Sequence, residues 1–132
     1  MLETGVEGVK KVRVTGGMLA SAVGSGMLPV FATPEMILLI EMTASESVAP
    51  LLGEGQSTVG ARLDVRHSAP SVEGAEVECR TRLAEVDGRR LAFEVEVRDE
   101  AGAVGSGTHE RFVVDGERFM SKAMERAARP RP

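Results

Sequence analysis

The chain has 132 residues, with 20 acidic and 16 basic side chains and a net charge of −4. This length suits one domain with a modest core, and we expect a single domain over residues 1–132 with frayed ends at 1–8 and 129–132. The mild acidity and the lack of a basic run exclude nucleic acid as the main partner, and no apolar stretch is long enough for a membrane span.

The N-terminal residues "MLETGVEGVKK" lack the basic-then-apolar order of a signal peptide, and Cys79 is the only cysteine. An internal disulfide and a multi-cysteine metal site are therefore excluded. The two histidines lie 42 residues apart and also have no metal-ligand spacing. We expect a cytoplasmic protein with no metal and no bound cofactor.

The first half of the chain predicts a short edge strand over residues 9–15 and a loop with a weak helical turn over 16–29. A helix then starts at Thr33-Pro34, with Thr33 as the N-cap and Pro34 as the first helical residue. It ends near residues 50–52, before Gly53 and Gly55. Its core-facing stripe is predicted to hold Ile37, Ile40, Ala44, Val48 and Leu51.

The second half alternates apolar and polar residues with period two, which is typical of strands with one covered face. The predicted inward rows are Val59, Ala61, Leu63 and Val65; Val77, Cys79, Thr81 and Leu83; and Leu91, Phe93, Val95 and Val97. Asp87-Gly88 predicts a hairpin turn. A last strand over 103–114 and a terminal helical piece over 117–129 follow.

This order of elements predicts the α+β class, with a curved antiparallel sheet wrapped around the long helix. Such a sheet leaves an exposed edge, so side-by-side dimerisation is expected.

Glu41 stands out because it lies inside the predicted apolar stripe of the helix. A carboxylate there is costly unless it is paired, protonated or hydrated, so Glu41 is a candidate acid, base or nucleophile. A glutamate at the rim with a purely structural bond is an equal alternative.

Three further positions are candidates for the same chemistry. His67 ends an inward-facing row, where it can bind a water or a carbonyl oxygen, although a satisfied core histidine is the commoner outcome. Thr33 is either only a helix cap or a hydroxyl beside an acyl group at the positive end of the helix dipole. Gly60 marks a turn whose backbone can approach a ligand.

His109 and Arg111 share one face of the last strand. Arg111 is either an anchor for a phosphate or carboxylate, or one half of an exposed cross-strand ion pair with Glu94 or Glu96.

Three motifs together resemble the fluoroacetyl-CoA thioesterase-like branch of the hotdog-fold thioesterases. They are "VFATPEMILLIEMTA", "APLLGEGQSTVGARLDVRHSAP" and "EVDGRRLAFEVEVRDEAGAVGSGTHERFVV", within residues 30–115. The resemblance implies a hotdog fold and a homodimer with active sites at the subunit interface, and it leaves open whether dimers pair into a tetramer. It also implies hydrolysis of a small acyl-CoA, with coenzyme A only as part of the substrate.

Carried over to this chain, the resemblance implies that Thr33, Glu41 and His67 are catalytic. Gly60 matches a glycine whose N–H lies near the substrate carbonyl or the attacking water, and Arg111 matches an arginine close to the site.

One segment departs from the family. The fluoroacetate-specific member has phenylalanines just before "VFAT", where this chain reads "VGSGMLPVF". Met27 and Phe31 are the predicted acyl contacts here, and we expect an acyl-CoA other than fluoroacetyl-CoA.

The helix geometry adds a constraint, because Thr33 and Glu41 are separated by about 12 Å of helix rise. Either Thr33 precedes the helix and folds back, or the site combines Thr33 of one subunit with Glu41 of the other. The alternative functions on the same fold are an enoyl-CoA hydratase or dehydratase, a non-catalytic acyl-CoA-binding module, and a structural dimer.

Overall fold

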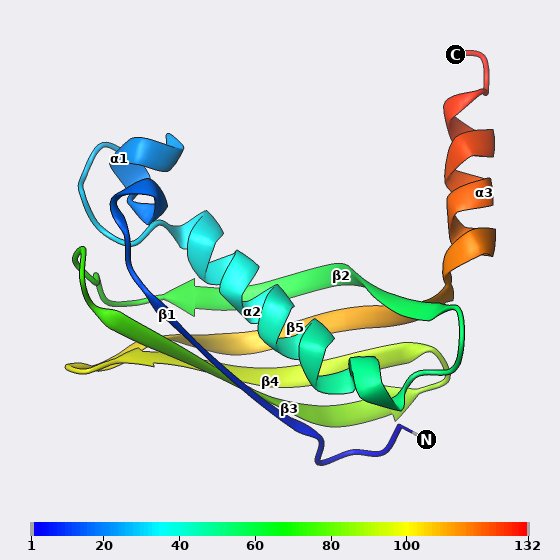
Figure 1. Cartoon of the computed structure of the whole chain (residues 1–132), viewed down its shortest axis with the longest axis horizontal. Helices are drawn as coiled ribbons and strands as arrows, with labels where there is room; N and C mark the ends of the chain where they lie inside the picture. The colour runs from blue at the N-terminus through cyan, green and yellow to red at the C-terminus, as the bar shows by residue number, and fades with distance from the viewer. Residues whose placement is uncertain (1, 132) are drawn as a thin grey trace.

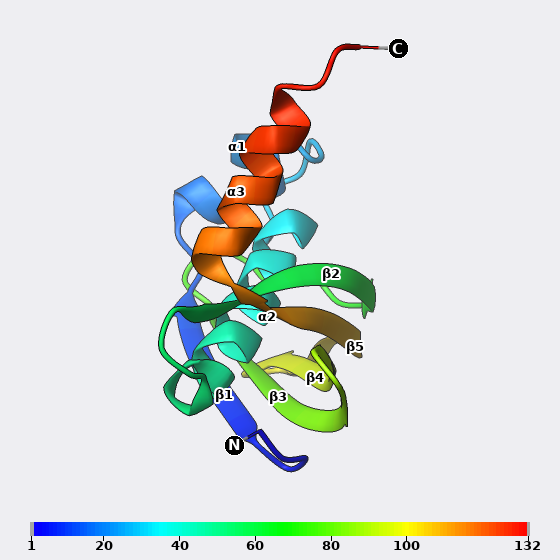
Figure 2. The same cartoon turned by 90° about the vertical axis from the view of Figure 1, so that its right-hand side faces the viewer.

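A five-stranded antiparallel sheet curves around one long helix in the computed structural model, which describes residues 2–131 (Figures 1 and 2). The strands lie in the order β1-β3-β4-β5-β2. Their bounds are Glu7–Arg13 for β1, Gln56–His67 for β2, Glu76–Asp87 for β3, Arg90–Asp99 for β4 and Gly102–Asp115 for β5. The helices are α1 (Ala20–Val23), α2 (Thr33–Val48) and α3 (Gly116–Ala127), with short 3-10 turns η1 (Gly16–Met18) and η2 (Ala49–Leu51).

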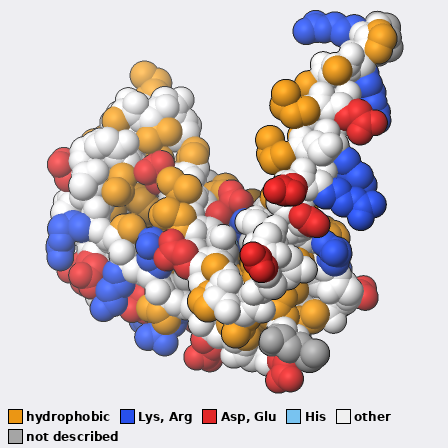
Figure 3. Space-filling view, turned by 45° about the vertical axis from the view of Figure 1, so that its right-hand side comes forward, with side chains coloured by type: hydrophobic (Ala, Val, Ile, Leu, Met, Phe, Trp, Pro, Cys, Tyr) orange, Lys and Arg blue, Asp and Glu red, His pale blue; other side chains and the backbone are white. Residues whose placement is uncertain are grey.

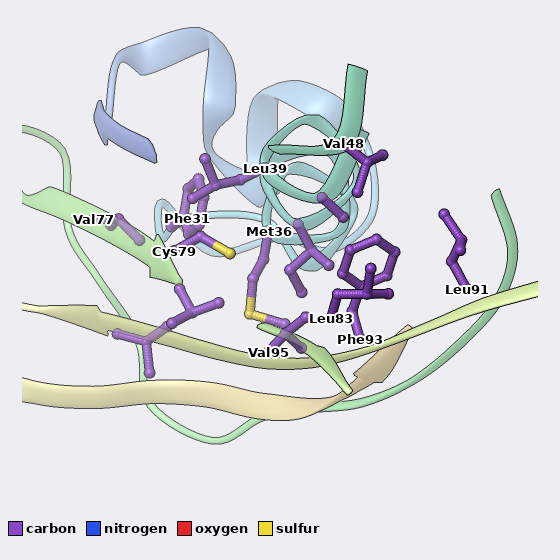
Figure 4. Packing of buried hydrophobic residues seen from close by; sticks show 14 of the residues in the cluster. Phe31, Met36, Leu39, Val48, Val77, Cys79, Leu83, Leu91, Phe93 and Val95 are labelled. Carbon is purple, nitrogen blue, oxygen red and sulfur yellow. The ribbon is translucent and has the colours of Figure 1, made fainter. Parts of the chain in front are cut away.

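The central strands β3 and β4 confirm the predicted alternation. Val77, Cys79, Thr81 and Leu83 of β3 are buried, and so are Leu91, Phe93, Val95 and Val97 of β4. Figure 4 shows Val77, Cys79, Leu83, Leu91, Phe93 and Val95 of these strands packed with Met36, Leu39 and Val48 of the helix in one apolar layer. The turn between the two strands falls at Gly88 and Arg89, one residue later than predicted, because Asp87 pairs with Arg90.

Helix α2 begins one residue earlier than the sequence predicts. Ala32, in an extended conformation, is the N-cap, and Thr33 is already helical. The prediction that Thr33 caps the helix is therefore wrong, because its hydroxyl bonds His67 instead of a backbone N–H of the first turn. At the other end α2 gives way to η2 before Gly53, as expected.

The buried face of α2 is rotated from the predicted stripe. Its buried residues are Met36, Leu39, Ile40, Thr43, Ala44 and Val48. Leu51 is 39% exposed, and Ile37 is only half-buried. Glu41 consequently lies at the margin of the packed face and keeps 38% of its side chain exposed.

The edge strand β2 contains a β-bulge that the sequence analysis missed. Its register with β5 shifts between Gly60, which pairs with Arg111, and Arg62, which pairs with Glu110. The extra residue reverses the alternation, so Thr58 is buried while Ala61 is exposed. Beyond the bulge, His67 is partly buried in phase with Leu63 and Val65, as predicted.

The N-terminal region is tied to the sheet from residue 5 onward. The Gly5 N–H donates to the Leu83 carbonyl and the Leu83 N–H donates to the Val6 carbonyl, each over 2.8 Å. Strand β1 follows directly at the sheet edge, so the expected fraying does not extend over residues 5–8. The fraying expected at Met1 and Pro132 lies outside the described residues.

No helix within residues 2–131 combines the length and the apolarity needed to cross a membrane.

Candidate active site

The first turn of α2 and the last residue of β2 bring Thr33 and His67 together. The Thr33 Oγ1 and the His67 Nδ1 are 2.8 Å apart. They lie in an open pocket whose walls also include Ala20, Ser25, Val30, Phe31, Ser68, Ala69 and Pro70. The ring of Phe31 is buried and meets His67 edge to face, with a centroid distance of 6.3 Å. The pair therefore has one apolar wall and one open side.

His67 is poised as a neutral imidazole. Burial lowers its pKa below the ordinary value of 6.5, and the backbone of Ala69 opposes the shift only in part. The Nε2 atom is buried and has no hydrogen-bond partner among the described residues. A neutral ring with one unused nitrogen can bind a water, a carbonyl oxygen or a leaving thiol.

The second group of polar residues surrounds Arg111 on β5. Arg111 is buried, with 6% of the residue exposed. Its Nε donates to Thr58 Oγ1 over 2.9 Å and its Nη2 donates to the Thr58 carbonyl over 3.1 Å. Its Nη1 lies 3.2 Å from Glu41 Oε2. The alternative in which Arg111 forms an exposed ion pair with Glu94 or Glu96 is wrong, because Arg111 is buried and pairs with Glu41.

His109 completes this group beneath Arg111. It is fully buried and stacks on Phe93 with a centroid distance of 6.1 Å. Burial, reinforced by the charge of Arg111, lowers its pKa, so the ring is neutral. Because Arg111 can only donate, His109 Nε2 accepts from Nη1 over 3.3 Å and Nδ1–H donates to the Arg62 carbonyl over 2.8 Å.

Gly60 leaves the space that the Glu41 carboxylate fills. A Cβ added at this position would lie 3.3 Å from Glu41 Cδ and 3.4 Å from Arg111 Nη1, and would overlap Glu41 Oε2. The bulge places Gly60 directly opposite Arg111 in the sheet. Gly60 was predicted to bring its backbone near a ligand, and its lack of a side chain also makes room for the Glu41 carboxylate.

The predicted catalytic residues thus fall into two groups within one chain. Thr33 and Glu41 both lie on α2, eight residues apart, which corresponds to about 12 Å of rise. Thr33 does not fold back along the helix, so that alternative is wrong. Met27 is 92% exposed and stands apart from the pocket that contains Phe31.

Two residues of the site escaped the sequence analysis altogether or in part. Thr58 was not singled out, and His109 was noted without a role. Thr58 reaches the site through the pairing of β2 with β5, which sets Thr58 and Gly60 of β2 opposite Val113 and Arg111 of β5. No group of three or more metal-ligating side chains occurs within residues 2–131.

The arrangement suits acyl chemistry. The N-terminus of α2 presents free N–H groups and a positive dipole end beside Thr33 and His67, which stabilises negative charge on a carbonyl oxygen. Glu41 is held by an arginine and remains accessible, as a base or nucleophile requires.

Comparison with known proteins places the chain among thioesterases. The family model described as fluoroacetyl-CoA-specific thioesterase matches residues 14–117. A fluoroacetyl-CoA thioesterase from Streptantibioticus cattleyicolor is 37% identical over 97 residues, which cover 74% of this chain and 70% of that protein.

Solved structures agree with this result. A structure of the fluoroacetyl-CoA thioesterase FlK matches with a TM-score of 0.89 and 30% identity, over 98% of this chain and 99% of that chain. A hot-dog-like protein from Thermanaerovibrio acidaminovorans matches with a TM-score of 0.88 and 24% identity, over 98% of this chain and 96% of that chain. The predicted hotdog fold is thereby confirmed.

Proposed function

The chain belongs to the fluoroacetyl-CoA-specific thioesterase family, and from this premise we propose that it hydrolyses a small acyl-CoA to the free acid and coenzyme A. The observation that carries the proposal is the pair of half-sites, Thr33 with His67 and Glu41 with Arg111. Each half provides what the other lacks, because one can bind an acyl group and the other offers a carboxylate.

The proposed enzyme is a homodimer that joins the outer edges of two β2 strands. Among the described strands, β2 and β1 each pair on one side only. The β1 edge is short and carries Lys10, Lys11 and Arg13, each already paired with a glutamate of its own chain, and charged side chains of this kind discourage edge pairing. Strand β2 is longer and is adjacent to both half-sites. Antiparallel pairing about a two-fold axis brings Glu41 of one subunit toward Thr33 and His67 of the other.

In the proposed reaction the acyl carbonyl lies at the N-terminus of α2 beside Thr33. Water adds to the carbonyl carbon with Glu41 as general base, or Glu41 itself attacks and water then cleaves the resulting anhydride. The carbon–sulfur bond breaks, and the departing thiolate takes a proton through His67. If water cleaves the anhydride at the Glu41 carboxyl carbon, a single turnover in ¹⁸O-labelled water leaves the label in Glu41, which identifies nucleophilic attack because general-base catalysis labels only the released acid.

The proposed substrate is a small acyl-CoA other than fluoroacetyl-CoA. The curated relative is a fluoroacetyl-CoA thioesterase, but residues 23–30 of this chain, "VGSGMLPV", contain no aromatic side chain. Phe31 remains as the buried apolar wall next to His67.

The test is release of free thiol from a panel of short, branched and aromatic acyl-CoAs that includes fluoroacetyl-CoA. We expect Glu41→Gln to lower kcat/KM by about 10²- to 10⁴-fold, the usual contribution of a positioned general base. Glu94→Gln is the control, since Glu94 pairs with Arg82 on the outer face of the sheet, away from both half-sites. Thiol release that survives Glu41→Gln contradicts the assignment, and a changed acyl chain without free thiol indicates a hydratase.

The shared site has its own test, in which the Glu41→Gln and His67→Ala variants are mixed and allowed to exchange subunits. If Glu41 and His67 come from different subunits, each mixed dimer has one intact site, and activity recovers to about a quarter of wild type. Neither variant recovers alone. Failure to recover, with subunit exchange confirmed by mass spectrometry, means that each chain carries its own complete site.

A further inference from the structure

Helix α3 is amphipathic, but within residues 2–131 nothing covers its apolar face. None of its residues is buried in the described chain, and Phe119, Met120 and Met124 are 40%, 56% and 66% exposed. At 100° per residue these three lie on one stripe with Ala123, whereas Arg118 and Glu125 lie opposite. In Figure 3 the apolar side chains of α3 face the rest of the molecule across a gap. An isolated helix of 12 residues is only marginally stable in water, so this stripe needs cover.

The position of α3 suggests what covers it. The helix leaves β5 beside the start of β2, where Asp115 pairs with Gln56 and the Gly116 N–H donates to the Gly55 carbonyl over 2.9 Å. In Figure 1, α3 extends beyond the β2 edge of the sheet, and α1 rises beyond the same edge at its opposite end. The free edge of β2 therefore lies between two projecting segments, in the space that a second copy would enter.

Two-fold symmetry decides which parts would meet. Antiparallel pairing of two β2 strands sets the start of one strand beside the end of the other. The α3 helix of one copy then lies next to residues 20–31 of its partner, close to His67. This segment contains no charged residue, and it exposes Val23, Met27 and Leu28 at 42%, 92% and 69%. Two otherwise unexplained apolar surfaces are thereby complementary.

We propose that the apolar stripe of α3 packs on residues 23–28 of a second copy of the chain and so closes the acyl pocket of that copy. The inference rests on the dimer and the acyl pocket of the proposed function. The proposal also places Met27, which reaches the pocket rim only when the partner's α3 packs on residues 23–28. The stripe cannot reach this segment in its own chain, because α1 and α3 lie at opposite ends of the sheet (Figure 1).

The placement is tested by cross-linking of a Leu28→Cys/Met124→Cys variant with a bis-maleimide shorter than a helix diameter. The native Cys79 is a suitable background, because it is buried and burial raises the pKa of its thiol to about 11. We expect a band of dimer size on a denaturing gel, and none from either single variant. Leu28→Cys/Glu125→Cys, on the opposite face of α3, is the matched control and should cross-link far less.

Three outcomes overturn the proposal. They are a cross-link within one chain, equal cross-linking by the Glu125→Cys control, and a stable dimer without any cross-link. Sedimentation of the wild type, but not of Met120→Asp, with phosphatidylcholine–phosphatidylserine vesicles in the absence of a cross-link would assign the stripe to a lipid surface instead. Because cross-linking needs no substrate, a cross-linked protein that releases no thiol contradicts only the proposed function.

Closure of the pocket has a separate readout. With the best acyl-CoA of the panel, Met124→Asp should raise KM about ten-fold or more, the effect of losing one buried apolar contact. Arg118→Ala, on the polar face, should not. An unchanged KM in Met124→Asp, with the cross-link intact, leaves the docking but rejects the closure.

Discussion

At the scale of single residues, Gly60 is the position where the smallest change should have the largest effect on activity. A Cβ there would meet the end of the Glu41 side chain and Arg111 Nη1. Gly60→Ala should therefore push the Glu41 carboxylate away from Arg111. The fold should remain intact, because the added methyl group meets only the ends of side chains that can move. We expect kcat/KM to fall about 10- to 100-fold, the loss that follows from displacing a catalytic group by about 1 Å. Steady-state kinetics beside thermal unfolding measure the two effects.

Combining Gly60→Ala with Glu41→Gln tests whether the glycine acts through the carboxylate. If it does, the double variant loses no more activity than Glu41→Gln alone, because the displaced group is already inactive. Additive losses would mean that Gly60 acts on the substrate through its own backbone.

The same scale shows which residues of the site the sequence could predict. His67 follows from alternation along its own strand, and Glu41 follows from its place among apolar helix neighbours. The environment of Arg111 depends instead on Thr58 and His109, which lie 53 residues and 2 residues away in sequence. The pattern of β5 alone does not decide between an anchor and an exposed ion pair for Arg111, because its partner Thr58 is set by the register between β2 and β5.

At the scale of elements, β3 and β4 were predictable over residues 77–83 and 91–97, where each keeps a period of two that burial on one face enforces. Strand β2 was not, since its bulge breaks the period and the bulge is set by its pairing with β5. The small residues Gly60 and Ala61 were the only local signal for it. The bulge turns Thr58 and Gly60 toward the helix. The same irregularity that breaks the alternation therefore forms the Glu41 half-site.

The start of helix α2 was also predictable only in part. Thr33-Pro34 correctly located the start of the helix to within one residue, because proline fixes its own backbone angle there. The cap itself went to Ala32, since His67 competes for the threonine hydroxyl. No local signal reports a partner 34 residues away.

At the scale of the whole molecule, the two histidines should make stability depend on pH. Folding lowers the pKa of both His67 and His109 below 6.5, chiefly through burial. As the pH falls through the ordinary value, the unfolded chain binds protons that the folded chain does not accept. The free energy of unfolding should therefore be highest above about pH 7 and decrease toward pH 5, by at most about 1.4 kcal/mol per pH unit for each histidine.

Urea unfolding at a series of pH values between 7 and 5 measures this dependence. The carboxylates of Glu78 and Asp99 do not obscure it, because their pKa values are lowered from 4.5 and 3.8 and they titrate below this range. His109→Gln should remove its share of the slope whatever it does to stability at pH 7, and His67→Gln should remove the remainder. A slope that persists unchanged in the double variant would mean that other groups titrate between pH 7 and 5 and that the two histidines do not cause the dependence.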